Sequence, residues 1–353
     1  MHRAIFASAL FVTGASIMAS APVPTPGKVM TYKDWTVGCD NGLSCQAVAL
    51  KPDGPWDDGL SVVVTRKAGL QAQPIVEISG FPAKLGRFRL LVDGKVTETG
   101  SLQTGAESIT LKDATAVKVA RALAKGTSLQ LVDASGAKYG AASLSGVAAA
   151  LRYVDSVQGR AGSKGAVIAL GARKAAAKKA MIPIFEVRKI APSDVLPDAS
   201  ALVALSEGSP CAQERFGSTQ DTAYSLGNGP GGAQSLVMLN CGAGAYNFSS
   251  GIYVGQRNAA GKWTFEPAKF DYGATGFSAD SKIPLLVNAD WDAATQTIGS
   301  YSKGRGLGDC GSSESWVWDG TMFRLTEATV MGECRGSVDW IPVWRAEVKL
   351  LPR

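Results

Sequence analysis

Residues 316–325 read Trp-Val-Trp-Asp-Gly-Thr-Met-Phe-Arg-Leu. Two short apolar runs flank the Asp319-Gly320 pair, and Asp-Gly is favoured in tight hairpin turns because both residues tolerate a positive φ. Aromatic and β-branched residues are also enriched in strands. The segment therefore predicts an antiparallel hairpin, with residues 316–318 in one strand and residues 323–325 in the other.

This hairpin belongs to a series of short β-like segments in the second half of the chain. Gly, Asn and Asp residues separate the segments, as is typical of turns between strands. The segments cover residues 235–239, 251–257, 262–266, 283–288, 297–303, 315–318, 322–327 and 339–347. We therefore predict a mainly β domain, stapled by disulfides, over residues 199–353.

The first half of the chain combines strand-like segments with two helical patterns. The predicted strands are residues 33–39, 60–66, 74–79 and 87–92, and Asp93-Gly94 marks a turn after the last of them. The predicted helices are residues 114–125 and residues 146–158, the second with Ser145 as its cap. Their expected buried stripes are Val117, Ala120 and Ala124 in the first helix and Val147, Leu151, Val154 and Val157 in the second.

These elements predict an α+β domain over residues 28–159, in which two helices pack on an antiparallel sheet. Residues 160–198 predict a linker to the second domain, because they are rich in Ala, Lys and, later, Pro. Residues 182–190 are compatible with a strand at the end of this linker. The fold class is thus α+β, with a mainly β second domain.

A basic cluster lies within the predicted linker. It consists of Arg173, Lys174, Lys178 and Lys179. A solvated linker explains these charges more simply than a nucleic-acid site, and the formal net charge of +6 is mild for 353 residues. We therefore expect no nucleic-acid partner.

The amino terminus has the three parts of a secretion signal. Arg3 supplies a positive charge, an apolar run follows it, and Ala19 and Ala21 form an A-x-A cleavage pattern. We predict a signal peptide over residues 1–21, and export to the periplasm or secretion. Pro22 would hinder a cut after Ala21, so a shifted cut or retention as an anchor stays open. No later stretch is long and apolar enough to span a bilayer, and we expect no transmembrane segment in the mature chain.

Cysteine usage fits an oxidising compartment. The six cysteines fall in three sequential pairs: Cys39 with Cys45, Cys211 with Cys241, and Cys310 with Cys334. An even count in an exported chain favours disulfides, although six cysteines can pair in many ways. We expect nearest-neighbour pairing, because it closes the shortest loops. Thiolate zinc sites are disfavoured because C-x-x-C spacing is missing, and we expect no metal.

The single histidine of the chain is His2, inside the predicted signal. A mature chain without histidine excludes a Ser-His-Asp triad, a Cys-His nucleophile pair and a His-ligated zinc or copper centre. Two matches to G-x-G-x-x-G begin at Gly227 and Gly306, and we interpret both as fortuitous because neither joins a predicted strand to a predicted helix. We expect no cofactor.

A bridge between Cys310 and Cys334 would gather charged residues around Tyr301, Trp316 and Trp318. The candidate binding residues of this loop surface are Lys303, Arg305, Asp309, Trp316, Trp318 and Arg335. Aromatic faces would stack on a sugar or peptide while the charges orient it. The alternative is structural: the charged residues pair with one another, and the tryptophans fill a small β core.

An enzymatic alternative also exists, because glycosidases need two acids and no histidine. The candidate acids are Asp309 and Glu333, and no residue is otherwise assigned a catalytic role. An acidic pair can be found in most chains, and the sequence does not establish the separation of these two.

Short motifs are spread along nearly the whole mature chain. They are Lys33-Asp34-Trp35 with Cys39 and Cys45, Ser143-Leu144-Ser145-Gly146, Val154-Asp155, Gln158-Gly159-Arg160, residues 300–311, Trp316-Val317-Trp318-Asp319-Gly320, Met331-Gly332-Glu333-Cys334-Arg335-Gly336, Trp340 and Trp344-Arg345-Ala346. In this order they resemble a bacterial family of exported proteins known only as a domain of unknown function. The first domain is also distantly similar to the invasion-associated locus B family, through its early Trp and Cys and its Ser-Leu-Ser-Gly helix start. The resemblance implies a Gram-negative periplasm and brings no activity or catalytic residue.

We therefore predict a non-enzymatic binding or interaction protein of the cell envelope. Its expected partner is an envelope protein or glycan, and the loop surface around Cys310 and Cys334 is the expected contact. The alternative function is a carboxylate-dependent hydrolase that acts on an envelope glycan.

Overall fold

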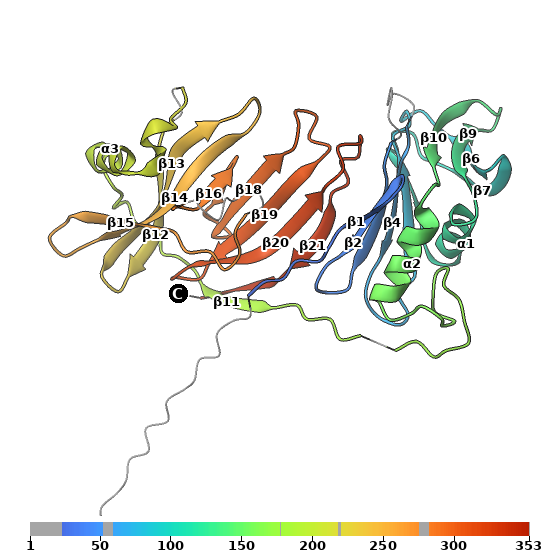
Figure 1. The fold of residues 1–353 in the computed structure, drawn as a ribbon, viewed down its shortest axis with the longest axis horizontal. Coiled ribbons are helices and arrows are strands. Elements are labelled where there is room, and N and C mark those ends of the chain that lie inside the picture. Colours follow the sequence, from blue (N-terminus) through green and yellow to red (C-terminus); the bar gives the residue numbers. More distant parts are fainter. Residues whose placement is uncertain (1–22, 52–58, 177, 218–219, 275–281, 353) are drawn as a thin grey trace, which may run out of the picture.

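The computed structural model describes residues 23–51, 59–176, 178–217, 220–274 and 282–352. The predicted signal peptide, residues 1–21, lies outside the described residues. Figure 1 shows two lobes side by side, the first with strands β1 to β10 and the second with strands β12 to β22. Within the described part of the chain, no helix has the length and apolar character needed to cross a membrane.

The first lobe contains two antiparallel sheets rather than the single sheet expected. Their strand orders are β1-β2-β3-β4-β5-β8 and β10-β9-β6-β7. The bounds are β1 (Met30–Tyr32), β2 (Trp35–Cys39), β3 (Cys45–Ala49), β4 (Ser61–Arg66), β5 (Pro74–Ser79), β6 (Arg87–Val92), β7 (Lys95–Ser101), β8 (Ser108–Leu111), β9 (Ser128–Asp133) and β10 (Lys138–Ser143). The sequences of β7 and β10, KVTETGS and KYGAAS, lack the apolar alternation that signals a strand, so they escaped the prediction.

The Asp93-Gly94 turn joins β6 to β7 as predicted. Val92 pairs with Lys95, so Asp93 and Gly94 alone form the loop, with φ of 48° and 76°. Positive φ at both positions matches the twist of the flanking strands, and Gly accepts it without a steric cost. The Asp93 carboxylate accepts a hydrogen bond from the Thr127 hydroxyl at 2.7 Å, which ties this hairpin to the start of β9.

Helix α1 (Asp113–Leu123) forms, but its buried face differs from the predicted stripe. The buried residues are Ala116, Val119, Ala120 and Leu123. Val117 and Ala124, predicted to be buried, are only partly so. The helix contacts β5 of one sheet and β7 of the other, and these two contacts decide which face is covered.

Helix α2 (Val147–Val157) packs on β1, β2 and β3. It begins after Gly146, whose φ is 104°, so Ser145 is not its cap. Val147, Leu151 and Val154 are buried as predicted, whereas Val157 is only partly buried. The buried face also includes a charged residue, Asp155.

Asp155 holds the chain that follows α2 against the first lobe. Its carboxylate accepts hydrogen bonds from the backbone N–H groups of Val167, Ile168 and Ala169 at 2.8, 3.0 and 3.0 Å. The Arg66 guanidinium donates to it at 3.2 Å, and both side chains are almost fully buried. A buried charge is tolerated only with such partners. Residues 167–169 are therefore fixed to the first lobe.

The second lobe contains two further antiparallel sheets. Their orders are β12-β13-β14-β15, with β16 also paired to β14, and β17-β18-β19-β20-β21. The bounds are β12 (Thr222–Gly229), β13 (Gly232–Ala243), β14 (Phe248–Arg257), β15 (Trp263–Pro267), β16 (Leu285–Val287), β17 (Asp290–Asp292), β18 (Thr297–Lys303), β19 (Gly311–Trp318), β20 (Phe323–Met331) and β21 (Ile341–Arg345). All eight segments predicted as strands in this half overlap one of these strands.

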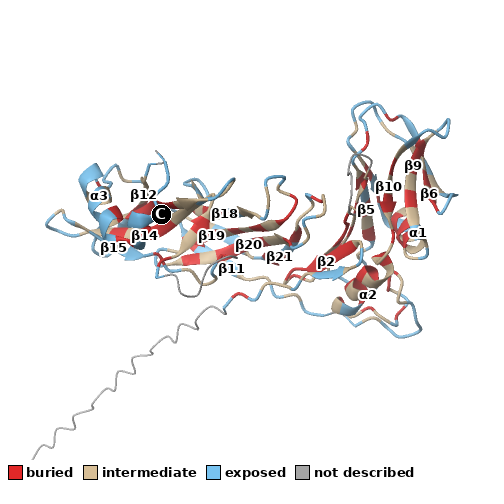
Figure 2. Ribbon diagram, turned by 45° about the horizontal axis from the view of Figure 1, so that its top comes forward, coloured by how far each residue is buried: buried red, intermediate tan, exposed pale blue. Residues whose placement is uncertain are grey.

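A helix that was not predicted, α3 (Ala199–Gly208), precedes these sheets and leads into a 3₁₀ turn, η1 (Pro210–Gln213). The Asp198 side chain caps α3 by accepting from the backbone N–H of Ala201 at 2.8 Å. Ser206 is the one buried residue of the helix, which is largely exposed in Figure 2. Without an apolar stripe, the helix left no periodic signal in the sequence.

The hairpin of residues 316–325 is confirmed as the junction of β19 and β20. Trp316 pairs with Leu325, and Trp318 pairs with Phe323. The loop between them has four residues, and the Asp319 carboxylate accepts from the backbone N–H groups of Thr321 and Met322 at 2.8 and 2.9 Å. Asp319 thus organises the turn through its side chain.

A separate pairing joins the middle of the chain to its end. Strand β11 (Ile184–Arg188) lies parallel to β22 (Glu347–Leu351). Figure 1 shows β11 running beneath the second lobe, close to the carboxy terminus.

The core of the second lobe extends into the first. Val48 and Leu50, from β3 and the residue after it, pack in one cluster with Ile341, Val343 and Trp344 around β21. The backbone N–H of Gly27 also donates to the carbonyl of Val343 at 2.8 Å. The two lobes therefore share apolar packing rather than only a linker.

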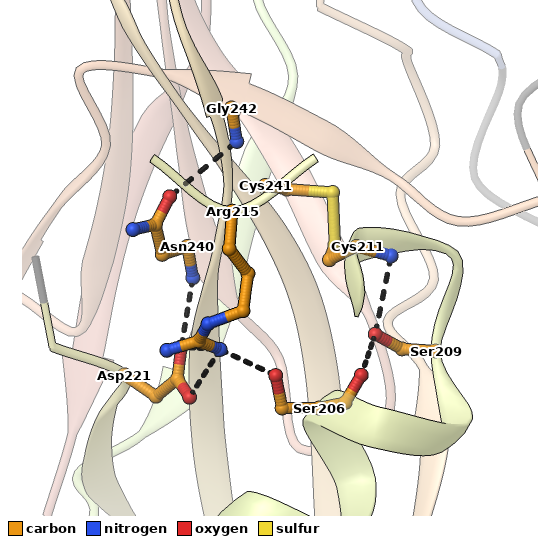
Figure 3. The surroundings of a disulfide bond; sticks show 8 residues. All are labelled: Ser206, Ser209, Cys211, Arg215, Asp221, Asn240, Cys241 and Gly242. Atoms are coloured by element: carbon orange, nitrogen blue, oxygen red, sulfur yellow. Dashed lines mark hydrogen bonds and ion pairs between the residues drawn. A yellow bond between two sulfur atoms is a disulfide. The ribbon is translucent and has the colours of Figure 1, made fainter. Parts of the chain in front are cut away.

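The three disulfides join nearest neighbours in the sequence, as predicted: Cys39–Cys45, Cys211–Cys241 and Cys310–Cys334. Figure 3 shows the second of these with its polar surroundings. Arg215 donates to Asp221 at 2.8 Å, and Asp221 accepts from the backbone N–H of Asn240 at 2.9 Å. The network fastens η1 and the turn after it to β13.

Candidate functional site

Asp34, in the turn between β1 and β2, connects three of the sequence motifs. Its carboxylate accepts from the Ser143 hydroxyl at 2.6 Å and from Arg335 at 2.7 Å, and its N–H donates to the carbonyl of Ser145 at 3.0 Å. The Trp35 indole N–H donates to the carbonyl of Ser143 at 2.9 Å. Burial raises the pKa of Asp34, but the hydrogen bonds from Arg335 and Ser143 outweigh it and hold the pKa below its ordinary value.

Arg335 clamps the second lobe to the first. Its Nε donates to the carbonyl of Lys51 at 2.9 Å, one terminal nitrogen donates to the carbonyl of Lys33 at 3.0 Å, and the other reaches Asp34. Every guanidinium nitrogen is therefore engaged inside the protein. Arg335 was predicted to bind a partner, and the structure places it in the lobe junction instead.

Residues 334–340, which we call the strap, run along this junction from the Cys310–Cys334 disulfide to β21. The Gln46 side chain of β3 donates to the carbonyls of Asp339 and Trp340 at 3.2 and 3.3 Å. The Ser61 hydroxyl of β4 donates to the Asp339 carboxylate. The first lobe thus fixes the backbone that carries Trp340.

An aromatic surface lies where the strap meets β18, and we call it the shelf. The ring of Tyr301 stacks on the indole of Trp340, with centroids 4.9 Å apart and planes 15° from parallel. Tyr301 is 40 % exposed. The pair opens onto a shallow pocket of about 570 Å³, and the shelf comprises its lining: Tyr301, Lys303, Gly306, Leu307, Gly308, Ser313, Thr329, Val338 and Trp340.

Strand register brings these side chains to one face of the sheet. Tyr301 pairs with Ser313, and Ser313 pairs with Thr329, so the three stand in one row across β18, β19 and β20. Ile298 and Ser300 point to the opposite face and are buried. The small side chains of Ser313 and Thr329 leave room above the sheet, and this room is the pocket.

Asp309 holds the Gly-rich loop that forms one wall of the shelf. Asp309 is 2 % exposed, and its carboxylate accepts from Arg305 Nε at 2.7 Å and from the backbone N–H of Gly336 at 2.6 Å. The hydrogen bond from Arg305 lowers the pKa of Asp309 more than burial raises it, and the Gly336 N–H lowers it further. Arg305 and Asp309 are therefore paired within the protein and link the loop to the strap.

Gly311 ends this loop and serves close backbone packing. Its φ is 141°, and a Cβ there would lie 1.9 Å from the carbonyl oxygen of Ser302. Gly311 is also the first residue of β19, and the other G-x-G-x-x-G match spans the β12–β13 turn, where Gly229 pairs with Gly232. Neither loop leads into a helix, so neither has the geometry of a dinucleotide fingerprint.

Lys303 is the predicted binding residue that the structure places on the shelf. Its ammonium nitrogen lies 6.0 Å from the ring centroid of Tyr246. The Tyr246 hydroxyl donates to the carbonyl of Gly304 at 3.2 Å, and the Asn247 side chain donates to the carbonyl of Lys303 at 2.8 Å. The turn between β13 and β14 therefore holds the backbone at the start of this loop.

Trp316 and Trp318 do not lie on this surface. They are 0 % and 3 % exposed, the Trp316 indole N–H donates to the carbonyl of Tyr272 at 3.0 Å, and Trp318 packs on Phe323. Both fill the core of the second lobe, as the structural alternative held. Neither indole ring is available for a partner.

The candidate acids of a hydrolase, Asp309 and Glu333, have different surroundings. Asp309 is committed to Arg305 and Gly336 and has a lowered pKa, whereas a general acid needs a raised one. Glu333 is partly exposed, beside Cys334. In the part of the chain that the structure describes, no group of three or more His, Cys, Asp or Glu side chains is arranged to hold a metal ion.

Leu307 and Trp340 are shelf residues that sequence reasoning missed. Leu307 is 65 % exposed within a loop of glycines and charged residues. The only local signal in the sequence is a leucine within a loop rich in turn residues, and single exposed apolar residues are common on protein surfaces. Trp340 gave no comparable signal, because its place depends on contacts with the first lobe.

Comparison with known proteins supports the family resemblance. Residues 29–347 match a family described as a protein of unknown function (DUF1176). The chain belongs to the DUF1176 family. It is similar to the uncharacterized protein YpfG of Escherichia coli (strain K12), with 25% identity over 333 residues that cover 89% of this chain and 91% of that protein. No solved structure matches the chain.

The DUF1176 match extends across both lobes. It begins just before β1 and ends at the first residue of β22. Asp34, Arg335 and the shelf therefore all fall within one family region. The likeness of the first lobe to the invasion-associated locus B family stays a prediction.

Proposed function

We propose that this protein is a non-catalytic binding protein of the cell envelope whose shelf holds a glycan. The stacked Tyr301–Trp340 pair on an open pocket carries the proposal. Sugar rings have apolar faces that pack on aromatic side chains and hydroxyl edges that need hydrogen-bond partners. The shelf offers both, because Ser313, Thr329 and Lys303 line the same pocket.

A glycan suits this surface better than an extended peptide. Peptides commonly bind by adding a strand to an exposed sheet edge. In the sheet that carries the shelf, one edge strand, β17, has only three residues, and the other, β21, contacts β2 of the first lobe. A peptide strand therefore has no long free edge to pair with in this sheet, and a ligand of the shelf is held by side chains on the sheet face.

The state of Asp309 supports binding rather than hydrolysis. Its carboxylate is buried, accepts three hydrogen bonds and has a lowered pKa. Proton donation to a leaving oxygen at neutral pH requires a protonated acid. Asp309 therefore acts as a structural anion in this proposal.

Three disulfides are typical of proteins from oxidising compartments. This supports the proposal that the protein works in the periplasm of a Gram-negative bacterium or is secreted. The partner is then a component that faces the same compartment.

Titration calorimetry with peptidoglycan fragments tests the function. We expect Tyr301→Ala to weaken binding by about tenfold or more, because central aromatic contacts dominate such sites. Tyr301→Phe, which keeps the ring face, should retain most of the affinity. Phe216→Ala removes another exposed aromatic ring outside the shelf and should change nothing.

Two results would contradict the proposal. One is turnover of a fragment that Asp309→Asn and Glu333→Gln both abolish, which would establish the hydrolase. The other is a photo-crosslinker at Leu307 that captures a single envelope protein in cells while no glycan binds, which would make the partner a protein.

A further inference from the structure

The first lobe carries a second concave surface, which we call the basic groove. It lies between α1 and residues 164–175 and has a volume of about 1080 Å³. Its cationic lining residues are Arg66, Lys118, Arg121, Lys125, Lys164 and Lys174. Asp113, at the start of α1, is the one carboxylate among the described residues that line it.

The cations come from two sides. Lys118, Arg121 and Lys125 follow one another on α1 and the turn after it at spacings of three and four, so they share a face of the helix. Lys164 and Lys174 face them from the chain that follows α2. With a rise of about 1.5 Å per residue, the row on α1 alone spans about 10 Å.

Three of these charges are available to a ligand. Lys118 forms an ion pair with Glu98, and Arg121 donates to the carbonyl of Val167 at 2.9 Å. Lys125, Lys164 and Lys174 are exposed, and no carboxylate of the described chain lies within ion-pair distance of them.

Arg66 forms the buried base of the groove, and its guanidinium already has hydrogen-bond partners within the protein. It donates to Asp155 at 3.2 Å, to the carbonyl of Gly165 at 2.7 Å and to that of Ala72 at 3.1 Å. Burial lowers the pKa of Arg66 to about 10, and the neighbouring charges of Arg160 and Arg121 contribute in the same direction. Positive charge thus accumulates here beyond what the internal pairs neutralise.

We propose that the basic groove binds an extended polyanion, a glycan chain that carries phosphate groups. A single phosphate would meet only part of a row of cations about 10 Å long, whereas a chain can meet them in succession. A planar membrane surface cannot follow a concave groove. None of the described lining residues is aromatic, so the stacking that retains single-stranded nucleic acid is missing.

The groove shares no residue with the shelf, so the two proposals stand apart. Tyr301→Ala should leave binding at the groove unchanged. A loss of binding at one surface therefore does not test the proposal for the other surface.

The test measures binding of a phosphorylated core oligosaccharide from lipopolysaccharide to the purified protein. The triple variant Lys125→Glu, Lys164→Glu, Lys174→Glu should bind about tenfold more weakly or worse, and the affinity of the unaltered protein should fall with salt. The control, Lys84→Glu, Lys95→Glu, Lys138→Glu, makes the same charge change at exposed lysines outside the groove and should stay within about twofold. Circular dichroism confirms that both variants are folded.

Other probes decide the nature of the ligand. Removal of the phosphates from the oligosaccharide should abolish binding, and inorganic phosphate alone should bind far more weakly than the chain. An equal loss in both triple variants would overturn the proposal, because binding would then follow net charge alone. Binding to anionic phospholipid vesicles but not to the oligosaccharide would overturn it in favour of a membrane surface.

Discussion

The guanidinium of Arg335 donates a hydrogen bond of 2.7 Å to the carboxylate of Asp34, across 301 positions of sequence. The same side chain holds the carbonyls of Lys33 and Lys51. We expect Arg335→Ala to lower the free energy of unfolding by about 1–3 kcal/mol, because it leaves a charged acceptor without its donor. Urea denaturation checks this, with Arg87→Ala, an exposed arginine of β6, as the control. Equal stability of the two variants would mean that the clamp contributes nothing.

The pairing of Asp309 predicts a pH dependence. Its folded-state pKa is lowered, chiefly by Arg305, so its charged form stabilises the fold. This contribution is fully present above the unfolded-state pKa of about 3.9 and is lost as the pH falls through the folded-state value. Asp309→Asn should therefore lower Tm by about 2–4 °C at pH 7, with a difference that shrinks below about pH 4. A constant difference across that range would show that the carboxylate charge is not what stabilises the loop.

The buried Asp155–Arg66 pair predicts a larger effect. Asp155→Asn leaves the Arg66 charge without its counter-charge in the core, so we expect a loss of about 3–5 kcal/mol in the free energy of unfolding. Hydrogen exchange at the amides of Val167, Ile168 and Ala169 should accelerate more than the loss of global stability alone predicts, because these amides donate to this carboxylate. Glu77→Gln, at an exposed position of β5, is the control and should be neutral.

The disulfides allow a matched comparison between stability and binding. Replacing both cysteines by serine in Cys310–Cys334 or in Cys211–Cys241 opens loops of similar length and should cost about 3 kcal/mol in each case. Only the first pair borders the strap and the shelf. Glycan affinity should therefore drop in the Cys310/Cys334 variant and persist in the Cys211/Cys241 variant under conditions where both are folded. Equal glycan affinities in the two variants would show that the Cys310–Cys334 disulfide does not position the shelf.

Much of the second lobe could be predicted from its sequence, because each strand carries its own local signal. Phe323 and Leu325 alternate with Arg324 at the start of β20, and Asp319 with Gly320 marks the end of β19. Helix α1 shows where local signals stop being sufficient. Apolar residues occur on nearly every side of it, so only its contacts with β5 and β7 select the buried face.

The site was harder to predict than the strands, because long-range contacts build it. The sequence alone does not show which of the tryptophans at positions 316, 318 and 340 lies on the surface. The register of β19 and β20 places the first two in the core. Trp340 reaches Tyr301 because Gln46 holds its backbone from the other lobe. Nothing local in the sequence distinguishes an arginine that clamps two lobes, such as Arg335, from one that awaits a partner.

The shared core around β21 also sets the order in which the protein can fold. Val48 and Leu50 are synthesised long before Ile341 and Val343, which pack in the same cluster. Strand β11 likewise waits for β22 before it is paired. Contacts so distant in sequence form slowly, and apolar surface left open meanwhile favours aggregation. A nascent chain that has not yet reached β21 therefore leaves Val48 and Leu50 without the residues that pack against them.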